Sequence, residues 1–161
     1  MAEMIDVIDE NDVVIGQVTR DELYQRNLSH RIVHVLVFDR KNRLLLTKSC
    51  ATKPFNPSTW GTSAGGHVQA GETTEHAAMR ELGEELGIQT NITLIGNDWF
   101  ETALHQRKCI SVFKTIHEGS FFPREDEIEQ ITFKSLTDVR TLISSGYNVT
   151  AELMWVLQRF V

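Results

Sequence analysis

One stretch of this 161-residue chain constrains its fold more than any other: residues 65–88, which read GGHVQAGETTEHAAMRELGEELGI. After the paired glycines, residues 73–86 contain no proline and many good helix formers, which predicts a helix there. Glu72 and Thr74 provide the acidic, hydroxyl-bearing start that suits the positive end of a helix. Gly87 follows the last periodic residue, where a left-handed cap is commonly needed. The stretch is therefore predicted to be a glycine loop that leads into one short helix.

Three carboxylates of this helix are predicted to share one face. Glu81, Glu84 and Glu85 stand at positions i, i+3 and i+4, which are neighbours on a helix surface. Crowded carboxylates raise one another's pKa unless a cation lies between them, and a ligand set of oxygen atoms favours Mg²⁺ or Mn²⁺ over zinc. A solvated acidic face is the alternative interpretation. The glycine loop and Arg80, at fixed offsets from the carboxylates, favour a metal site.

The charge and the apolar runs of the chain restrict its partners. The formal net charge is −6 and no basic stripe could neutralise phosphates, so a nucleic acid polymer is not expected as a partner. An anionic small molecule would have to be received by a bound metal or by individual Lys and Arg side chains. No apolar stretch approaches the roughly 20 residues of a membrane span, and the acidic N-terminus does not read as a signal peptide. Because Cys50 and Cys109 lack metal-ligand spacing, we expect reduced thiols and a cytoplasmic protein.

The rest of the chain reads as short strands with a few helices. A hairpin is predicted over residues 4–19 and a short helix over 21–26. Mixed strands with one central helix and a C-terminal helix predict a single α+β domain over residues 1–161, built as an α/β/α sandwich around a mixed β-sheet. The further strands are expected at 32–38, 43–47, 60–64, 93–100, 109–116 and 131–133, and the further helices at 138–144 and 149–160.

The central stretch resembles the Nudix box, and all nine specified positions of that motif, between residues 66 and 88, are filled. The chain is similar in this respect to Nudix hydrolases. The resemblance implies the sandwich fold and the hydrolysis of a diphosphate bond in a nucleoside diphosphate linked to another group. The matching residues are Gly66, Glu72, Arg80, Glu81, Leu82, Glu84, Glu85, Gly87 and Ile88, in the order Gly-x5-Glu-x7-Arg-Glu-U-x-Glu-Glu-x-Gly-U, where U is a bulky aliphatic residue.

The resemblance also implies roles for individual residues. Glu81, Glu84 and Glu85 match the metal-binding positions, with the Gly65 carbonyl as a further candidate ligand, and the implied cofactor is Mg²⁺ or Mn²⁺. Arg80 and Glu72 match the pair that orients the box, since a guanidinium holds carboxylates in a fixed fork geometry.

A water molecule activated by the metal is expected to attack phosphorus, and a carboxylate must take its proton. Two candidates for this base stay open. Glu81 could act from within the box. Glu127, in the acidic turn after Pro123, is the candidate outside the box, and its alternative role is that of a solvated turn residue.

The substrate is expected to be a small diphosphate compound, a nucleotide derivative in the first instance. Lys53 and Arg31 are proposed to meet the diphosphate, with surface solubility as their alternative role, and Gly65 and Gly66 would let the backbone approach it closely. The apolar stripe of the C-terminal helix suits either core packing or a homodimer interface. The aromatic side chains considered as walls of the substrate site are Phe55, Trp60, Trp99, Phe100 and Tyr147.

Two other functions are weighed against hydrolysis. Features outside the box, such as the opening DVIDENDVVIG and the approach SAGGHV, resemble the branch related to isopentenyl diphosphate isomerase. In that enzyme a catalytic cysteine occupies the position of Gly65, although His30 and His67 match histidines that help to bind its metal. A nucleotide-binding domain without catalysis typically loses box carboxylates, and all of them are present here. Hydrolysis is therefore the favoured prediction.

Overall fold

A mixed sheet of seven strands forms the centre of the computed structural model, which describes residues 1–161. The strands follow the order β5-β4-β3-β8-β7, while β6 also pairs with β3 and β9 pairs with β4. β3 and β8 run parallel, and the other pairs are antiparallel. The seven strands are β3 (His30–Phe38), β4 (Arg43–Ser49), β5 (Trp60–Gly61), β6 (Ala64–His67), β7 (Thr93–Glu101), β8 (Arg107–Ile116) and β9 (Ile128–Ser135).

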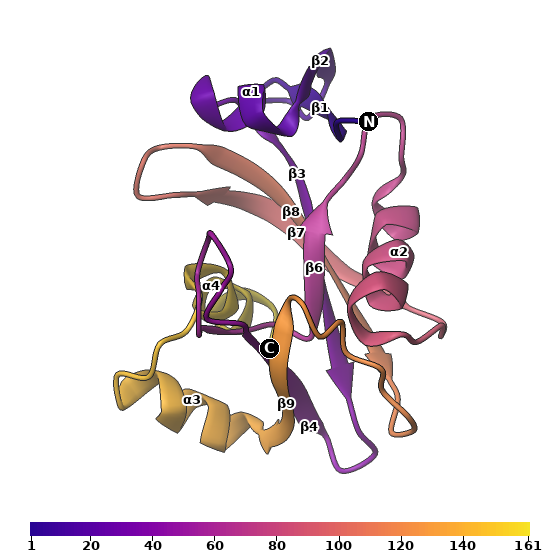
Figure 1. Cartoon of the computed structure of the whole chain (residues 1–161), viewed down its shortest axis with the longest axis vertical. Coiled ribbons are helices and arrows are strands. Elements are labelled where there is room, and N and C mark those ends of the chain that lie inside the picture. Colours follow the sequence, from indigo (N-terminus) through magenta and orange to yellow (C-terminus); the bar gives the residue numbers. More distant parts are fainter.

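Helices cover both faces of this sheet (Figure 1). Val35 of β3 belongs to a core that it shares with α2 (Thr74–Leu86). Leu36 belongs to a second core, which it shares with α3 (Leu136–Ser144) and α4 (Ala151–Phe160). Successive side chains of a strand point to opposite faces, so a strand that is buried on both faces reads as a continuous apolar run. The predicted α/β/α sandwich around a mixed sheet is confirmed.

Helix α2 ends at the predicted residue, Leu86, and begins at Thr74, one residue later than predicted. The Thr73 hydroxyl accepts a hydrogen bond of 3.1 Å from the His76 N–H and so caps the N-terminus. Gly87 has a φ of 66°, and its N–H donates to the Gly83 carbonyl at 3.1 Å. Because this left-handed conformation strains residues with a Cβ, a glycine suits the end of the helix.

Most predicted strands are one or two residues longer in the structure, and two of them differ more. The expected strand over 60–64 is divided into β5 and β6, because Ser63 turns inward between them. Its Oγ accepts from the Val37 N–H at 2.8 Å and donates to the Leu45 carbonyl at 2.6 Å. β9 begins at Ile128 instead of residue 131, because β4 pairs with it from that residue onward. Both differences come from hydrogen bonds between segments that are distant in sequence.

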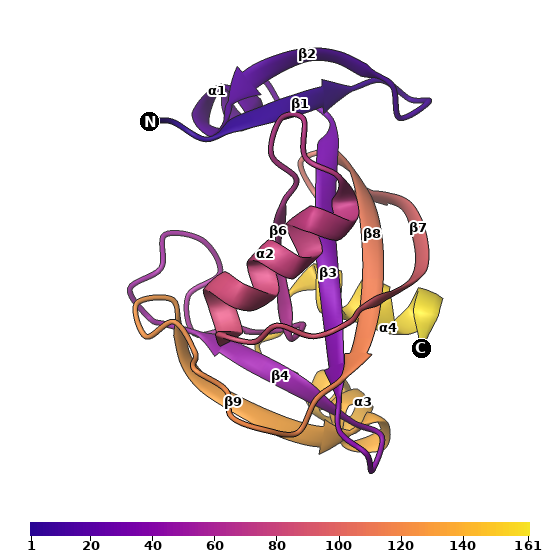
Figure 2. The same cartoon turned by 90° about the vertical axis from the view of Figure 1, so that its right-hand side faces the viewer.

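The first 28 residues form a separate unit at one end of β3, called the N-terminal cap below (Figure 2). β1 (Met4–Ile8) and β2 (Val14–Thr19) pair as a two-stranded antiparallel sheet, and α1 (Arg20–Gln25) follows them. The predicted hairpin and short helix are thus confirmed. The cap has a small core of its own, made of Ile5, Val7, Val18 and Leu23 with Leu28 packed against it.

The apolar stripe of the C-terminal helix packs inside the molecule. Leu153 and Val156 are buried in the core beneath β3 and β8, and Trp155 and Phe160 pack against the same core. The core-packing interpretation of this stripe is confirmed. None of the helices combines the length and the apolar character that crossing a membrane would require.

Candidate active site

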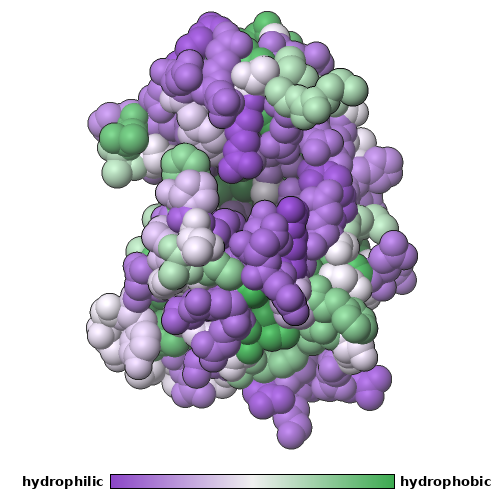
Figure 3. All heavy atoms as spheres, in the orientation of Figure 1, coloured by the Kyte–Doolittle hydropathy of each residue, from purple (hydrophilic) through white to green (hydrophobic).

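A cleft of about 510 Å³ is lined by residues of α2, the N-terminal cap and the loop that joins β4 to β5. In Figure 3 the surface is hollowed between the cap, at the top, and the rest of the molecule, and mainly hydrophilic side chains surround the hollow. The cleft brings together residues that are far apart in the sequence. Among those predicted to act in the site, its lining contains Lys53, Gly65, Gly66, Arg80, Glu81, Glu84, Glu85 and Glu127.

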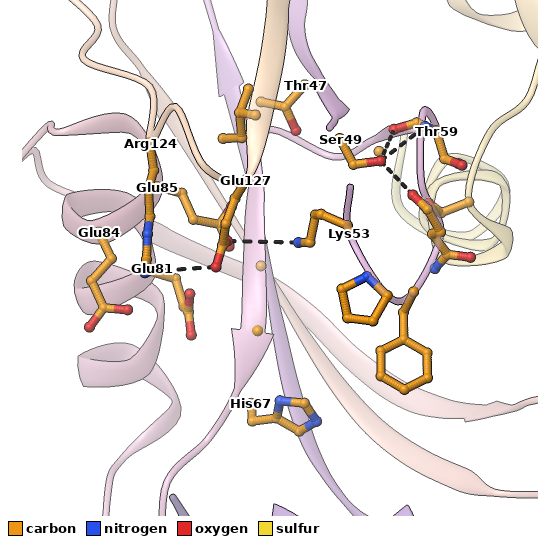
Figure 4. Close-up of a pocket in the computed structure, with 18 of the residues that line it drawn as sticks. Thr47, Ser49, Lys53, Thr59, His67, Glu81, Glu84, Glu85, Arg124 and Glu127 are labelled. Atoms are coloured by element: carbon orange, nitrogen blue, oxygen red, sulfur yellow. Dashed lines mark hydrogen bonds and ion pairs between the residues drawn. The ribbon is translucent and has the colours of Figure 1, made fainter. Parts of the chain in front are cut away.

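Helix α2 presents its three predicted metal-binding carboxylates at different depths. Leu82 and Leu86 are buried against the sheet, and this packing sets the rotation of the helix. Glu81 is buried, Glu85 is half-buried and Glu84 is exposed at the rim. Figure 4 shows the three side chains together at one wall of the cleft. The shared face that their spacing predicted is therefore turned toward the cleft.

Arg80 connects this wall to the loop before α2. Its Nε and Nη2 donate to the two carboxylate oxygens of Glu72 at 2.9 and 3.0 Å. Nη1 donates to Glu81 at 2.8 Å, and Nη2 also donates to the His67 carbonyl at 2.9 Å. Although burial opposes it, the hydrogen bonds from Arg80 lower the pKa of Glu72. A guanidinium with all these partners holds the carboxylates in place and is not free to bind a substrate.

The two glycines of β6 allow close contacts on both sides of their backbone. A Cβ at Gly66 would overlap the carboxylate of Glu81. A Cβ at Gly65 would lie 2.8 Å from Nδ1 of His34 and 2.9 Å from the Val33 carbonyl oxygen. Adjacent residues of a strand face opposite sides, so one glycine makes room for α2 and the other for β3. This arrangement gives a physical reason for the two glycines.

Glu127 reaches the cleft from the loop that precedes β9. The Arg124 N–H donates to the carbonyl of Glu85 at 2.9 Å, and the Cys50 N–H donates to the carbonyl of Glu127 at 2.9 Å. These bonds tie the loop to the end of α2 and to the end of β4. The Glu127 carboxylate lies 3.7 Å from Lys53 Nζ and 3.6 Å from Arg124 Nη1 (Figure 4). Glu127 thus lies beside the box carboxylates, with two cations around it.

Negative charge is concentrated at the base of the cleft. Burial, followed by the charges of Glu81 and Glu127, raises the pKa of Glu85 well above its usual value. Burial also raises the pKa of Glu81, although the hydrogen bond and charge of Arg80 oppose this shift. One unit of pKa corresponds to about 1.4 kcal/mol, so ionising these groups together is costly. A cation among them would reduce that cost.

The donor set fits a hard divalent cation. Glu81, Glu84 and Glu85 offer only carboxylate oxygens, which Mg²⁺ and Mn²⁺ prefer. No three His, Cys, Asp or Glu side chains are already gathered around one point as metal ligands. Arg80 explains this arrangement, because it binds Glu81 at 2.8 Å and reaches Glu84 at 3.4 Å. An incoming ion would therefore compete with Arg80 for these carboxylates.

The structure does not bring Arg31 into the cleft lining. Its Nε donates to the Asp12 carboxylate at 2.7 Å and its Nη2 to the Asp12 carbonyl at 2.6 Å. Arg31 therefore fastens the turn between β1 and β2 to β3. An arginine next to a predicted strand carries no local signal that distinguishes this partner from a substrate phosphate. We do not keep Arg31 among the residues proposed to bind substrate.

Of the aromatic residues considered as walls, only Phe55 lies in the cleft lining, where its side chain is largely exposed. Trp60 and Phe100 pack against the core near α4. The ring of Trp99 lies under the guanidinium of Arg107 at 4.5 Å. Three of these aromatics thus have partners within the fold, Phe55 faces the site, and Tyr147 is exposed outside the lining.

Sequence reasoning did not identify several residues that line the cleft. Arg124 stands in the same turn as Glu127, so its position could have been inferred together with that of the glutamate. Glu3 and Arg20 come from the N-terminal cap, and nothing in their local sequence marks them as functional. His67, which the sequence indicated only through the isomerase branch, also lines the cleft, and its Nε2 is 2.7 Å from the Tyr24 hydroxyl. Only the packing of the cap on the segment after β6 places Glu3 and Arg20 there.

Comparison with known proteins agrees with this geometry. The chain matches the NUDIX domain family over residues 28–153. It is 33% identical over 130 residues to an uncharacterized Nudix hydrolase, YfcD, of Salmonella typhi, covering 80% of this chain and 70% of the relative. It is also 29% identical over 153 residues to isopentenyl-diphosphate Delta-isomerase 2 of Photorhabdus laumondii, covering 92% of this chain and 86% of the relative.

Solved structures show the same fold. The DR0079 protein of Deinococcus radiodurans superposes with a TM-score of 0.87 at 23% identity, covering 98% of this chain and 99% of that chain. The NUDIX domain of Shewanella oneidensis NrtR, solved with ADP-ribose, superposes with a TM-score of 0.65 at 14% identity, covering 88% of this chain and 96% of that one. The chain therefore belongs to the Nudix hydrolase family, whose enzymes cleave pyrophosphate bonds in nucleoside diphosphate derivatives and generally use divalent metal ions.

Proposed function

We propose that this protein hydrolyses the diphosphate bond of a nucleoside diphosphate derivative in a reaction that depends on Mg²⁺, with Mn²⁺ as a substitute. One observation carries the proposal. Glu81 and Glu85 of α2 and Glu127 of the loop before β9 line a single polar cleft, beside the glycine backbone of β6. The ADP-ribose found with the NrtR domain is a compound of the proposed class, since it contains a diphosphate that links a nucleoside to a sugar.

The residues of α2 would hold the cation. Glu81, Glu84 and Glu85 supply the oxygen ligands, and the carbonyl of Gly65 is a further candidate donor. A bound divalent cation would neutralise charge on the diphosphate and lower the pKa of a water molecule. Arg80, itself held by Glu72, keeps the carboxylate of Glu81 oriented toward the cleft.

We assign Glu127 as the base that accepts the proton of the attacking water. A base must be free to take a proton, and Glu81 is already occupied by its hydrogen bond from Arg80. Glu127 reaches the cleft from the loop before β9, where Lys53 and Arg124 flank it without a bond shorter than 3.6 Å. Either cation can also contact a phosphate oxygen when a substrate enters.

The proposal is tested by incubating the purified protein with nucleoside diphosphate derivatives, with and without Mg²⁺, and identifying the products. We expect a nucleoside monophosphate together with the phosphorylated second group, and no reaction in EDTA. Tight binding without product formation would show a binding domain instead. Conversion of isopentenyl diphosphate to dimethylallyl diphosphate would show an isomerase.

Replacing Lys53 by alanine is expected to weaken substrate binding more than it slows the chemistry. Lys53 lines the cleft, and its Nζ is 3.7 Å from Glu127, so it can contact the diphosphate before and during the reaction. An interaction made equally in the ground and transition states changes KM and leaves kcat almost unchanged; we expect KM to rise about tenfold. Steady-state kinetics measures both constants. Lys41→Ala is the control, because Lys41 is exposed and lies outside the cleft. If Lys53→Ala and the wild type have equal KM and kcat values, the proposal that Lys53 binds the substrate is refuted.

Placing a cysteine at position 65 is not expected to create an isomerase. The added Cβ would lie 2.8 Å from His34 Nδ1 and 2.9 Å from the backbone oxygen of Val33, which cannot move away without disturbing β3. We therefore expect Gly65→Cys to lower the melting temperature and to impair hydrolysis, with no dimethylallyl diphosphate formed from isopentenyl diphosphate. Mass spectrometry of the products and a thermal melt check both parts. Isomerisation by the unmodified protein, above a control without enzyme, would contradict the assignment.

A further inference from the structure

We propose that the N-terminal cap selects the substrate, and that Glu3 and Arg20 together bind an uncharged, hydroxyl-bearing group such as a sugar at the end of the cleft. This inference rests on the proposed hydrolysis of a diphosphate and names the group on the far side of that diphosphate. The family match starts at residue 28, so the cap lies almost wholly outside it. Nevertheless, the cap contributes Glu3 and Arg20 to the cleft lining.

The cap is firmly attached to the segment between the glycines and α2. The Ala70 N–H donates to the Met4 carbonyl at 2.8 Å, and the Gly71 N–H donates to the carboxylate of Asp6 at 3.0 Å. Figure 2 shows β1 passing over the loop that leads into α2. The positions of the cap side chains are therefore set relative to the box, as a specificity site requires.

Tyr24 of helix α1 contacts two residues that line this end of the cleft. Its hydroxyl is 2.7 Å from Nε2 of His67, which follows the two glycines in β6. Its ring stacks on Phe55 with the centroids 6.3 Å apart and the planes 23° apart. Since Phe55 and His67 both line the cleft, the cap, β6 and the loop after β4 meet at one place. A group attached to the diphosphate would meet the cap there.

Glu3 and Arg20 use little of each other's hydrogen-bonding capacity. The closest approach, from Arg20 Nη1 to Glu3 Oε2, is 3.9 Å, and the Arg20 side chain is 49% exposed. The Arg80 guanidinium, by contrast, has hydrogen bonds of 2.8–3.0 Å to Glu72, Glu81 and the His67 carbonyl. The cap thus offers the cleft one acceptor group and one donor group with unused hydrogen-bonding capacity.

This combination suits hydroxyl groups better than a phosphate or an apolar chain. A hydroxyl donates to a carboxylate and accepts from a guanidinium, so both side chains can bind it. A phosphate only accepts, and Glu3 would repel it beside Arg20. The amide of Gln69, also in the lining, adds a donor and an acceptor. An isoprenoid chain would have few apolar partners here, because Phe55 and Ile128 are the only large hydrophobic side chains in the cleft lining.

The test compares Glu3→Gln and Arg20→Ala with two substrates, a nucleoside diphosphate sugar and the corresponding nucleoside triphosphate. We expect Arg20→Ala to raise KM for the sugar compound about tenfold, since a hydrogen bond to a charged group is lost. Glu3→Gln should raise it by a smaller factor, because the glutamine oxygen still accepts from the hydroxyl but lacks the charge. Both variants should change kcat little. The triphosphate should be the poorer substrate. Arg26→Ala is the matched control, because Arg26 lies beyond the end of α1, pairs with Glu22 at 2.6 Å and is outside the cleft lining.

The sign of the Glu3→Gln effect separates a hydroxyl group from a phosphate. If the cap binds phosphate, Glu3→Gln lowers KM for the triphosphate while Arg20→Ala raises it, and that result overturns the proposal. Variants that behave like Arg26→Ala while the wild type hydrolyses the sugar compound also overturn it, without affecting the proposed function. If the wild-type protein hydrolyses no diphosphate compound at all, the proposed function is refuted, and the cap proposal, which rests on it, falls with it. Thermal melts show whether Arg20→Ala is folded, and Glu3→Gln, which keeps the side-chain shape, decides the matter if it is not.

Discussion

Replacing Glu85 by glutamine is expected to lower kcat by about a hundredfold or more, the scale of losing a preorganised charge in an active site. Glutamine keeps the size of the side chain but removes the charge that would hold the cation. In metal-free buffer at neutral pH the variant should melt at the same temperature as wild type or higher. The reason is that burial and the neighbouring charges of Glu81 and Glu127 raise the pKa of Glu85. Steady-state kinetics with Mg²⁺ and thermal melts in EDTA measure the two effects.

The sign of the pH effect on stability follows from the same shift. A carboxyl group whose pKa is raised by folding contributes most to stability below its unfolded pKa, and this contribution is lost as the pH rises through the folded value. The advantage of Glu85→Gln over wild type should therefore appear at neutral pH and disappear in acid. Glu75→Gln is the control, since Glu75 is an exposed residue in the first turn of the same helix. Wild-type turnover by Glu85→Gln would refute its assignment as a metal ligand.

Replacing Gly66 by alanine is expected to reduce turnover by a similar factor, about a hundredfold. The new Cβ would overlap the carboxylate of Glu81, whose nearest oxygen already accepts a hydrogen bond from Arg80. The carboxylate must then leave its position, and catalysis that depends on positioned ligands loses rate even for small displacements. The binding of Mg²⁺, measured by calorimetry, should weaken in parallel with kcat.

Helix α2, which carries Glu81, provides a matched control for the Gly66→Ala substitution. An alanine Cβ at Gly83 would meet no atom within 4 Å. Because alanine favours a helix interior over glycine by about 1 kcal/mol, Gly83→Ala should raise the melting temperature and leave kcat unchanged. If Gly66→Ala behaves like Gly83→Ala, the close approach of β6 to Glu81 has no catalytic role.

Part of the site could be predicted from the sequence because its geometry is local. The spacing of Glu81, Glu84 and Glu85 places them on one face as soon as the segment is helical, and the helix signals around Thr73 and Gly87 are themselves local. The glycine pair and Arg80 lie in consecutive parts of one short segment, made of a strand, a loop and a helix. Short-range backbone geometry relates all these residues, so their order in the chain is enough to predict their neighbourhood.

The other parts of the site depend on long-range packing. Glu127 lies beside Glu85 because the loop before β9 bonds to the end of α2, and no local pattern at Glu127 distinguishes this from a solvated turn. Arg31 of β3, predicted to meet the substrate, instead forms an ion pair with Asp12 of the N-terminal cap.

The sequence by itself therefore determined the fold class and the shared face of the box carboxylates, because periodicity and spacing act within a few residues. The reaction class came from the resemblance of residues 66–88 to the Nudix box. Only the tertiary structure decided which cations face the cleft, and that the N-terminal cap provides Glu3 and Arg20 to it. The physical reason is that hydrogen bonds and apolar contacts between distant segments select one arrangement among many that the local signals allow equally.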